Sequence, residues 1–146
     1  MASKGTVIVT GCSQGIGAAV VHAFLDRGYA VVATSRNVKN ASLPSSANLA
    51  LAEGDIGQAS TAEEVVRTAI STFGSIDHVV NNAVAPGIVD TPMHTNHPKD
   101  FLKTLSPMGT ISDAKDIADA VVYLAEARHV TGEVLHVDGG SHQGTW

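Results

Sequence analysis

A stretch of glycines and small polar residues follows a β-branched run near the N-terminus, and this arrangement can hold a phosphate group. The run Thr6–Val9 leads into the segment Thr10-Gly11-Cys12-Ser13-Gln14-Gly15-Ile16-Gly17. Glycines at a strand–helix junction permit a tight turn and let backbone amides approach a pyrophosphate, and the helix N-terminus adds partial positive charge. Glycines also serve ordinary turns, so it is the position after a buried strand that favours a dinucleotide site. The expected contacts are Gly11, Ser13, Gln14, Gly15, Ile16 and Gly17.

The residues after the second predicted strand bear on which dinucleotide fits. About 20 residues beyond the glycines, an acidic side chain would hydrogen-bond the adenosine ribose and repel a 2′-phosphate. This chain has Ser35 and Arg36 there instead. Both side chains are donors, and a guanidinium suits a phosphate by charge and by geometry. We therefore expect NADP(H), with NAD(H) as the alternative, although a solvated arginine at a strand end would also explain Arg36.

Hydrophobic runs and stripes predict the elements that position these residues. Strands that alternate with helices indicate a parallel α/β sheet, and a chain of 146 residues suits one domain, residues 1–146. The expected strands are Thr6–Val9, Ala30–Thr34, Leu49–Ala52, Ile76–Asn82 and Gly132–Val137, and the expected helices are Gly15–Arg27, Thr61–Phe73, Pro98–Leu105 and Asp113–Ala127.

Composition limits the binding partners and the cellular compartment that we expect for this chain. The net charge is −5 and the basic residues are scattered, so nucleic acid and anionic membranes are not expected as partners. No apolar run approaches the ~20 residues of a membrane span, and we expect an unprocessed, cytoplasmic chain. Cys12 is the only cysteine, which excludes an intrachain disulfide. It is most simply a tolerated small residue, with an oxidation sensor as the alternative. His94 and His97 have a spacing that could serve a metal, but a surface pair is the simpler interpretation.

The spacing Thr-Gly-x-x-x-Gly-x-Gly resembles the short-chain dehydrogenase/reductase family. Further matches to that family follow in order along the chain: Asp55-Ile56, Asn81-Asn82-Ala83, Pro86-Gly87-Ile88-Val89-Asp90-Thr91-Pro92, Pro107-Met108-Gly109, Asp116-Ile117-Ala118, and Thr131-Gly132 through Val137-Asp138-Gly139-Gly140. The resemblance implies a Rossmann-like fold, which is a three-layer, doubly wound parallel α/β sheet. It also implies hydride transfer between a nicotinamide cofactor and a carbonyl or an alcohol.

The resemblance adds expected cofactor contacts beyond the glycine loop. Asp55 and Ile56 would read adenine through a carboxylate and a backbone amide. Asn82 and Ala83 belong to the strand-four motif. The loop Pro86–Pro92 would pack against nicotinamide, with the Ile88 backbone and the Thr91 hydroxyl on the carboxamide; its expected contacts are Pro86, Gly87, Ile88 and Thr91.

Two of these motifs are fused in the run Asn81–Gly87. Asn81-Asn82-Ala83 resembles the end of the family's fourth strand, and Asn82-Ala83-Val84-Ala85-Pro86-Gly87 resembles the end of its sixth strand with the following loop. The part of the family that normally separates them carries a catalytic serine, tyrosine and lysine. The resemblance therefore implies a chain that keeps a cofactor site and has lost an internal segment.

The family's catalytic tyrosine and lysine lie four residues apart. The tyrosines of this chain are Tyr29 and Tyr123, and the fourth residues after them are Ala33 and Ala127. Neither pair fits, so no catalytic residue is assigned. We expect an NADP(H)-binding protein with little or no turnover. The alternatives are a working oxidoreductase with substitute or partner-supplied residues, and an oligomeric interaction module.

The shortened chain has consequences for the sheet. About five strands are expected in the order 3-2-1-4-5, with the last strand paired to the fused strand Ile76–Ala83. Thr61–Phe73 would be the one helix left on its side of the sheet. We expect the bare part of that face to be buried against a second copy, or strands to be exchanged between copies, and either arrangement predicts a homo-oligomer.

Overall fold

The computed structural model describes residues 3–81, 85–130 and 134–143 of the 146-residue chain. Four parallel strands form its main sheet, in the order β3-β2-β1-β4. The strands are β1 (Thr6–Thr10), β2 (Ala30–Ser35), β3 (Leu49–Glu53) and β4 (His78–Val80). β1 and almost all of β2 are buried, as expected for β-branched and small residues that are covered on both faces.

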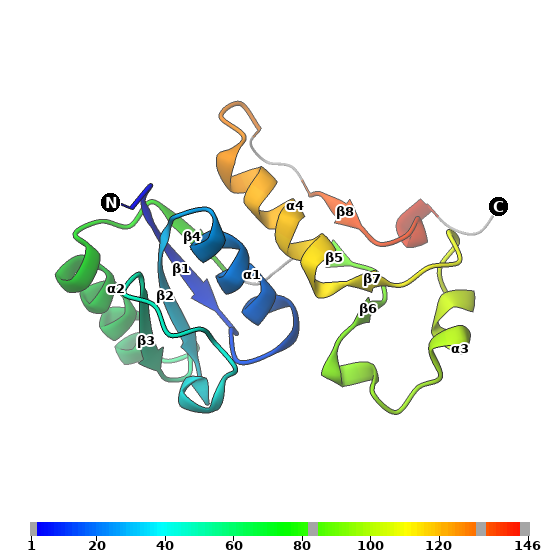
Figure 1. Cartoon of the computed structure of the whole chain (residues 1–146), viewed down its shortest axis with the longest axis horizontal. Coiled ribbons are helices and arrows are strands. Elements are labelled where there is room, and N and C mark those ends of the chain that lie inside the picture. The colour runs from blue at the N-terminus through cyan, green and yellow to red at the C-terminus, as the bar shows by residue number, and fades with distance from the viewer. Residues whose placement is uncertain (1–2, 82–84, 131–133, 144–146) are drawn as a thin grey trace.

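Helices cover both faces of this sheet (Figure 1). On one face, α1 (Gly15–Asp26) and α4 (Ala114–Glu126) pack side by side over Val7 and Val9. On the other face, α2 (Ala59–Phe73) packs over Ile8 and Val32. Alternate residues of a strand point to opposite faces, so β1 serves both cores. The three-layer parallel α/β fold predicted from the sequence is confirmed.

The predicted helices are found with ends shifted by a residue or two. Gly74 ends α2 with a φ of +84°, and its N–H donates to the carbonyls of Ala69 and Ile70, which is a typical C-terminal cap. Asp113 caps α4 by accepting hydrogen bonds from the backbone N–H groups of Lys115 and Asp116. The remaining predicted helix is α3 (Lys99–Thr104).

The C-terminal part of the chain forms short strand pairs rather than a fifth strand of the main sheet. β5 (Ala85–Pro86) pairs with β8 (His136–Val137), and β6 (Val89–Asp90) pairs with β7 (Ser112–Asp113). Single 3-10 turns accompany these elements: η1 (Val38–Asn40), η2 (Pro92–His94) and η3 (Ser141–Gln143).

The predicted partner of the last strand is therefore wrong. Among the described residues, the part of it that forms β8 pairs with β5 and not with β4, and the main sheet has four strands where about five were expected. Gly87 explains why the pairing occurs there. A Cβ on Gly87 would lie 2.5 Å from the carbonyl oxygen of Asp138, so only glycine lets the two backbones approach this closely.

The α2 face of the sheet is incompletely covered. Val79 of β4 pairs with Ile8, and neighbouring residues in a parallel register share a face, so Val79 lies on the α2 side. Its side chain is nevertheless 56% exposed. Val66 and Ile70 of α2 are also about half exposed. Val79 is thus an exposed apolar side chain on this face of the sheet, and Val66 and Ile70 are exposed apolar side chains of the helix that covers part of it.

No helix in the described ranges is long and apolar enough to cross a membrane.

Asp77 joins the start of β1 to the start of β4. Its Oδ2 atom accepts a 2.7 Å hydrogen bond from the Thr6 backbone N–H and a 2.8 Å bond from the Ser75 hydroxyl. The Thr6 bond, followed by the Ser75 bond, holds the pKa of Asp77 below its usual value. The ionised carboxylate thus fixes the register of two parallel strands that are far apart in sequence.

We expect Asp77→Asn to lower the melting temperature at neutral pH and to reduce its fall under acid conditions. Because the folded-state pKa is lowered, this contribution is complete above the ordinary carboxyl pKa of about 3.9 and is lost as the pH falls through the folded value. Thermal melts between pH 3 and pH 7 test this. Asp100→Asn is the control, since Asp100 is 96% exposed and pairs only with Lys103 at the surface. Identical acid dependence in Asp77→Asn and the wild type would contradict the role of Asp77.

Candidate functional site

The glycine loop lies at the carboxyl end of β1, the strand at which the order of the sheet reverses. From β1 the chain builds outward through β2 to β3, and then returns to place β4 on the other side of β1. In open parallel sheets, such a switch point between neighbouring strands is where a crevice forms and ligands bind. The fold thus places Gly11–Gly17 at the natural binding position.

Three glycines of the loop have distinct roles. Gly11 and Gly15 have φ values of +64° and +57°, a region that favours glycine. Gly17 is needed for proximity: a Cβ there would lie 2.2 Å from the Gly11 carbonyl oxygen. The first turn of α1 can therefore pack directly on the end of β1.

The N-terminus of α1 is left available to an anion. Gln14 is its N-cap residue, with extended backbone and no side-chain capping bond, and no acidic residue stands in the first turn. The first backbone N–H groups of a helix have no intrahelical partner and carry partial positive charge. This helix end therefore suits a phosphate group. Ile16 packs partly buried against the core and anchors the turn.

A cavity of about 220 Å³ joins the glycine loop to the ends of β2 and β3. It brings together six of the residues predicted from the sequence: Gly11, Ser13, Ser35, Arg36, Asp55 and Ile56. Asp55 accepts a 3.0 Å hydrogen bond from the Gly57 N–H, and Ile56 is about half exposed at the wall. Asp55 and Ile56 thus present a carboxylate and an apolar side chain at the wall of the cavity.

The cavity also has three lining residues that the sequence reasoning missed: Thr34, Asn37 and Gly54. Thr34 is 1% exposed, and its hydroxyl oxygen has no hydrogen-bond partner within the described structure. A buried hydroxyl without a partner is costly unless a ligand or water satisfies it. The sequence feature that could have identified Thr34 as a lining residue is its position directly before Ser35, at the carboxyl end of β2.

Arg36 is exposed at the rim of this cavity and pairs with no carboxylate of the described residues. Ser35 beside it accepts a 3.3 Å hydrogen bond from the Asn37 N–H. Cys12 lies beneath the loop, fully buried, and burial raises the pKa of its thiol. A buried, protonated thiol is not a nucleophile, so Cys12 is a packing residue in this arrangement.

The loop after β5 approaches the glycine loop from the other side. A Cβ on Gly15 would lie 3.4 Å from the Cγ2 atom of Thr91, so Thr91 is next to the turn. Pro86 pairs with Val137, the Gly87 N–H donates to the Val137 carbonyl, and the Ile88 carbonyl accepts from the Ser112 N–H. The structure thus brings Thr91 to the glycine loop and holds its neighbours in the short strand pairs. Asn82 and Ala83 lie outside the described residues.

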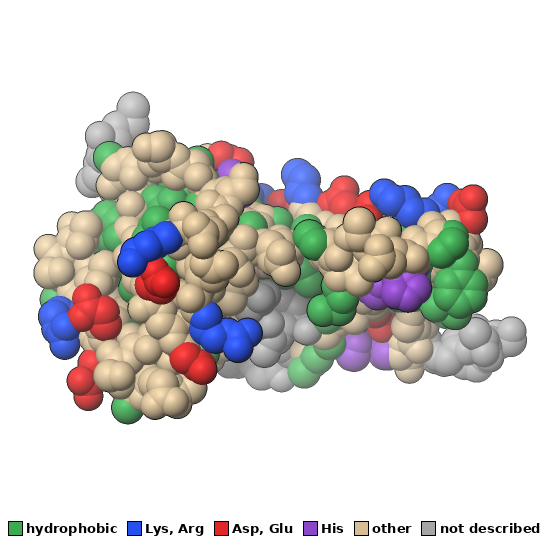
Figure 2. All heavy atoms as spheres, turned by 90° about the horizontal axis from the view of Figure 1, so that it is seen from below, with side chains coloured by type: hydrophobic (Ala, Val, Ile, Leu, Met, Phe, Trp, Pro, Cys, Tyr) green, Lys and Arg blue, Asp and Glu red, His purple; other side chains and the backbone are tan. Residues whose placement is uncertain are grey.

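A second hollow of about 490 Å³ opens beyond Thr91. His94 and His97 line it, with ring centroids 5.8 Å apart, and an ion pair between Lys99 and Asp90 closes one side. Figure 2 shows histidine side chains gathered over the right-hand part of the molecule, where Figure 1 places β6, β7 and α3. This pair does not belong to any group of three metal-ligating side chains among the described residues.

Neither tyrosine is placed to serve as an acid at either hollow. Tyr29 is 7% exposed in the core, where its hydroxyl donates to Glu126 at 3.3 Å. Burial, with the nearby charges of Glu126 and Asp77, raises its pKa. Tyr123 is exposed on α4 and lines neither hollow.

Sequence comparison decides the family. The sequence profile described as "short chain dehydrogenase" matches residues 5–106, which is more than half of the chain. The chain belongs to the short-chain dehydrogenase family. A second profile, "Enoyl-(Acyl carrier protein) reductase", matches residues 81–142. The two matched ranges share residues 81–106, the part that contains the fused motifs. This agrees with a family member shortened internally.

Individual family members match only part of this chain. A 3-oxoacyl-[acyl-carrier-protein] reductase from Bos taurus is 48% identical over 59 residues, which cover 40% of this chain and 25% of that protein. A 3-oxoacyl-[acyl-carrier-protein] reductase FabG from Vibrio harveyi is 47% identical over 70 residues, covering 44% and 28%. The matched segment thus spans about a quarter of the length of these curated relatives.

Solved structures share its fold. A short-chain dehydrogenase/reductase from Brucella melitensis has a TM-score of 0.81 at 20% identity, covering 95% of this chain and 97% of that one. ElxO with NADP bound has a TM-score of 0.82 at 18% identity, covering 97% and 99%. A short-chain dehydrogenase/reductase of unknown function from Caenorhabditis elegans, solved with cofactor, has a TM-score of 0.85 at 16% identity, covering 97% of this chain and 96% of that one.

The close contact at Gly17 predicts that adding one methyl group at this position lowers the stability of the fold. We expect Gly17→Ala to destabilise the fold by about 1–3 kcal/mol, because the Cβ must push α1 away from the end of β1. Thermal or urea unfolding measures the change. Gly28→Asn is the matched control, since Gly28 has a φ of +84° and open space around it, a position that asparagine tolerates. Equal stability of Gly17→Ala and the wild type would refute the close approach.

Proposed function

We propose that this chain is an NADP(H)-binding protein that performs little or no hydride transfer. The observation that carries the proposal is the cavity between the glycine loop and the ends of β2 and β3, with Arg36 at its rim. The pyrophosphate would lie on the N-terminus of α1, adenine between Asp55 and Ile56, and the 2′-phosphate at Ser35 and Arg36. Nicotinamide would extend past Gly15 toward Ile88 and Thr91.

The preference for NADP(H) over NAD(H) rests on the electrostatics of Arg36. Six other basic side chains form ion pairs with carboxylates: Arg27, Lys39, Arg67, Lys99, Lys103 and Lys115. Arg36 forms no ion pair with the described residues. It lies at the rim of the cavity, and the residues at the end of β2, Ser35 and Arg36, include no acidic side chain. A guanidinium in that position supplies charge and paired donors to a phosphate. The NADP-bound ElxO structure, which shares the fold, supports the same cofactor class.

The expectation of little turnover rests on the absent acid. In the family that this chain resembles, tyrosine protonates the substrate oxygen, lysine lowers its pKa and serine orients the substrate. Loss of a positioned general acid alone lowers the rate by roughly 10²–10⁴-fold. Tyr29 is enclosed in the core and Tyr123 lies outside both hollows. Binding would persist without them, because the cofactor contacts belong to other elements. A cytoplasmic location stays a prediction from the sequence.

Fluorescence titration of NADPH and NADH tests the cofactor proposal. We expect wild-type protein to bind NADPH more tightly than NADH. Arg36→Asp should weaken NADPH binding roughly 10- to 100-fold, equivalent to about 1.5–3 kcal/mol for charge-assisted hydrogen bonds. It should leave NADH binding unchanged or improved. Arg128→Asp, at another exposed arginine, is the control and should change neither affinity.

The same preparations separate the alternatives. Absence of NADPH binding by folded wild-type protein would overturn the proposal in favour of an interaction module. NADPH consumption with a panel of aldehydes and ketones, abolished by Gly15→Trp, would instead establish a working oxidoreductase. Binding without consumption is the expected result.

We further propose that the chain forms a homo-oligomer through the uncovered part of the α2 face. Val79 is about half exposed on this face, and Val66 and Ile70 of α2 are exposed to a similar extent. Within the described residues, no strand pairs with the outer edge of β4. An exposed apolar surface beside an open strand edge favours association, since a second copy would cover both.

Light scattering coupled to size exclusion tests this association. We expect a dimer or a larger species for the wild type, and Val79→Lys should shift it toward the monomer by placing a charge in the contact. Met93→Lys is the control, because Met93 is 82% exposed in a different part of the chain. A wild-type monomer at micromolar concentration, with a cooperative melt, would contradict the proposal.

A further inference from the structure

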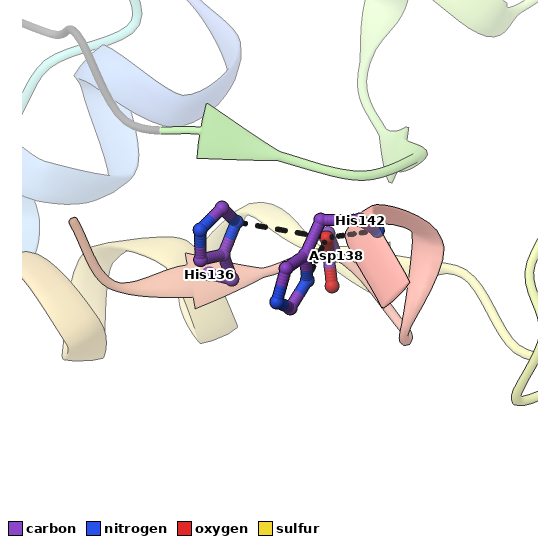
Figure 3. Close-up of side chains that lie close together, drawn as sticks. All are labelled: His136, Asp138 and His142. Carbon is purple, nitrogen blue, oxygen red and sulfur yellow. Dashed lines mark hydrogen bonds and ion pairs between the residues drawn. The ribbon is translucent and has the colours of Figure 1, made fainter. Parts of the chain in front are cut away.

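Three side chains that could hold a metal ion meet at the C-terminal end of the structure. His136, Asp138 and His142 offer ligand atoms that all lie within 4.8 Å of one another. Figure 3 shows both imidazoles beside the carboxylate, one from β8 and one from η3. The cluster lies outside the cofactor cavity and takes no part in the proposed cofactor binding.

Both histidines direct the same ring nitrogen to the same carboxylate oxygen. The Nδ1 atom of His142 lies 2.8 Å from Oδ2 of Asp138, and the Nδ1 atom of His136 lies 3.8 Å from it. The two rings are stacked, with centroids 3.7 Å apart and planes 9° from parallel. Two nitrogens and one carboxylate oxygen thus converge on a single small region.

The local sequence explains this convergence. His136 lies in β8 and Asp138 directly follows that strand, and the two side chains lie on the same side, with the His136 Nδ1 atom 3.8 Å from the Asp138 carboxylate. Gly139 and Gly140 then adopt φ values of +62° and +88°, which turn the chain back. The turn places His142 beside Asp138, where its backbone N–H donates to Oδ2 at 2.9 Å.

The carboxylate is oriented before any ligand arrives. The Gly140 N–H donates to Oδ1 of Asp138 at 3.0 Å, and the side chain is 9% exposed. A carboxylate that is fixed by hydrogen bonds and flanked by imidazoles is the type of ligand set that metalloproteins position through hydrogen bonds to the ligands.

The cluster stands on a well-anchored part of the backbone. The Gly139 carbonyl accepts hydrogen bonds from the Met108 N–H at 3.1 Å and from the Ser106 hydroxyl at 3.3 Å. On the preceding residues, the Val137 carbonyl accepts from the Gly87 N–H. The ligands are therefore positioned by contacts with two separate segments of the chain, at Gly87 and at Ser106–Met108.

We propose that His136, Asp138 and His142 together bind one divalent transition-metal ion, with Zn²⁺ as the preferred occupant. Zinc binds imidazole nitrogens and carboxylate oxygens at about 2.0–2.2 Å, which places pairs of ligand atoms roughly 3–4 Å apart. The Nδ1–Oδ2 separations of 2.8 and 3.8 Å lie in or close to that range. Because the two rings are stacked, their in-plane lone pairs lie in nearly parallel planes, and the imidazoles would have to turn toward each other about their side-chain bonds to meet one ion. Two imidazoles favour the late first-row ions over Mg²⁺ and Ca²⁺, which prefer oxygen ligands.

The histidine side chains are each 36% exposed, so water can complete the coordination. The ion would join η3 to β8, and through the pairing of β8 with β5 it would stabilise the C-terminal part of the chain. The competing explanation is a hydrogen-bonded His142–Asp138 pair with His136 stacked on it, which would bind no ion.

Isothermal titration of chelator-treated, untagged protein with ZnCl₂ tests the proposal. We expect one ion per chain with micromolar affinity, a rise in melting temperature on adding Zn²⁺, and visible d–d absorption when Co²⁺ is used instead. His136→Ala and His142→Ala should each weaken Zn²⁺ binding at least tenfold and remove the Zn²⁺-dependent rise in melting temperature.

The double substitution of His94 and His97 by alanine is the matched control and should retain both effects. Melting curves without metal establish that each variant is folded. Failure of the folded wild type to bind Zn²⁺ would overturn the proposal in favour of the hydrogen-bonded pair. Binding that survives in both His136→Ala and His142→Ala, or that is lost in the His94/His97 control, would overturn it in favour of another site. NADPH affinity is measured separately, so failure here leaves the cofactor proposal intact.

Discussion

The pairing of β1 with β2 on one side and β4 on the other is the constraint on which the remaining structure depends. β1 contributes Val7 and Val9 to the core under α1 and α4, and Ile8 to the core under α2. Its carboxyl end carries the glycine loop, so the same strand organises both layers and the binding crevice. The Asp77 carboxylate, which receives the Thr6 N–H, holds the far end of this pairing in register.

The sequence predicted the long elements well because periodicity averages over many residues. The apolar stripes of α1 and α4, and the β-branched runs of β1 and β2, each repeat a burial pattern that the structure reproduces. The stripe of α2 is reproduced only in part, because Ala69 is buried while Val66 and Ile70 are about half exposed. The two-residue strands of the C-terminal part have no period to detect. Their partners are selected by close backbone approach, as at Gly87 and Asp138, and such proximity is a property of the assembled fold.

The residues of the candidate site also divide into those that the sequence predicts and those that it does not. Six lining residues of the cavity could be identified from the sequence, because they belong to the glycine loop, to the end of β2 or to the pair Asp55-Ile56. Thr34, Asn37 and Gly54 could not, since their roles depend on how the ends of β2 and β3 meet. The cluster of His136, Asp138 and His142 was likewise hidden, because the turn at Gly139 and Gly140 brings together residues that the sequence shows merely as neighbours.

The position of Cys12 has a consequence for how motions of this molecule can be observed. It is the single cysteine of the chain, and it is enclosed between the glycine loop and the helical layer. A thiol reagent can reach it when the junction of β1 and α1 opens. The rate of alkylation under native conditions would therefore report the local opening of this junction, without any introduced label. The chain thus contains its own probe of the turn that cradles the phosphates in our proposal.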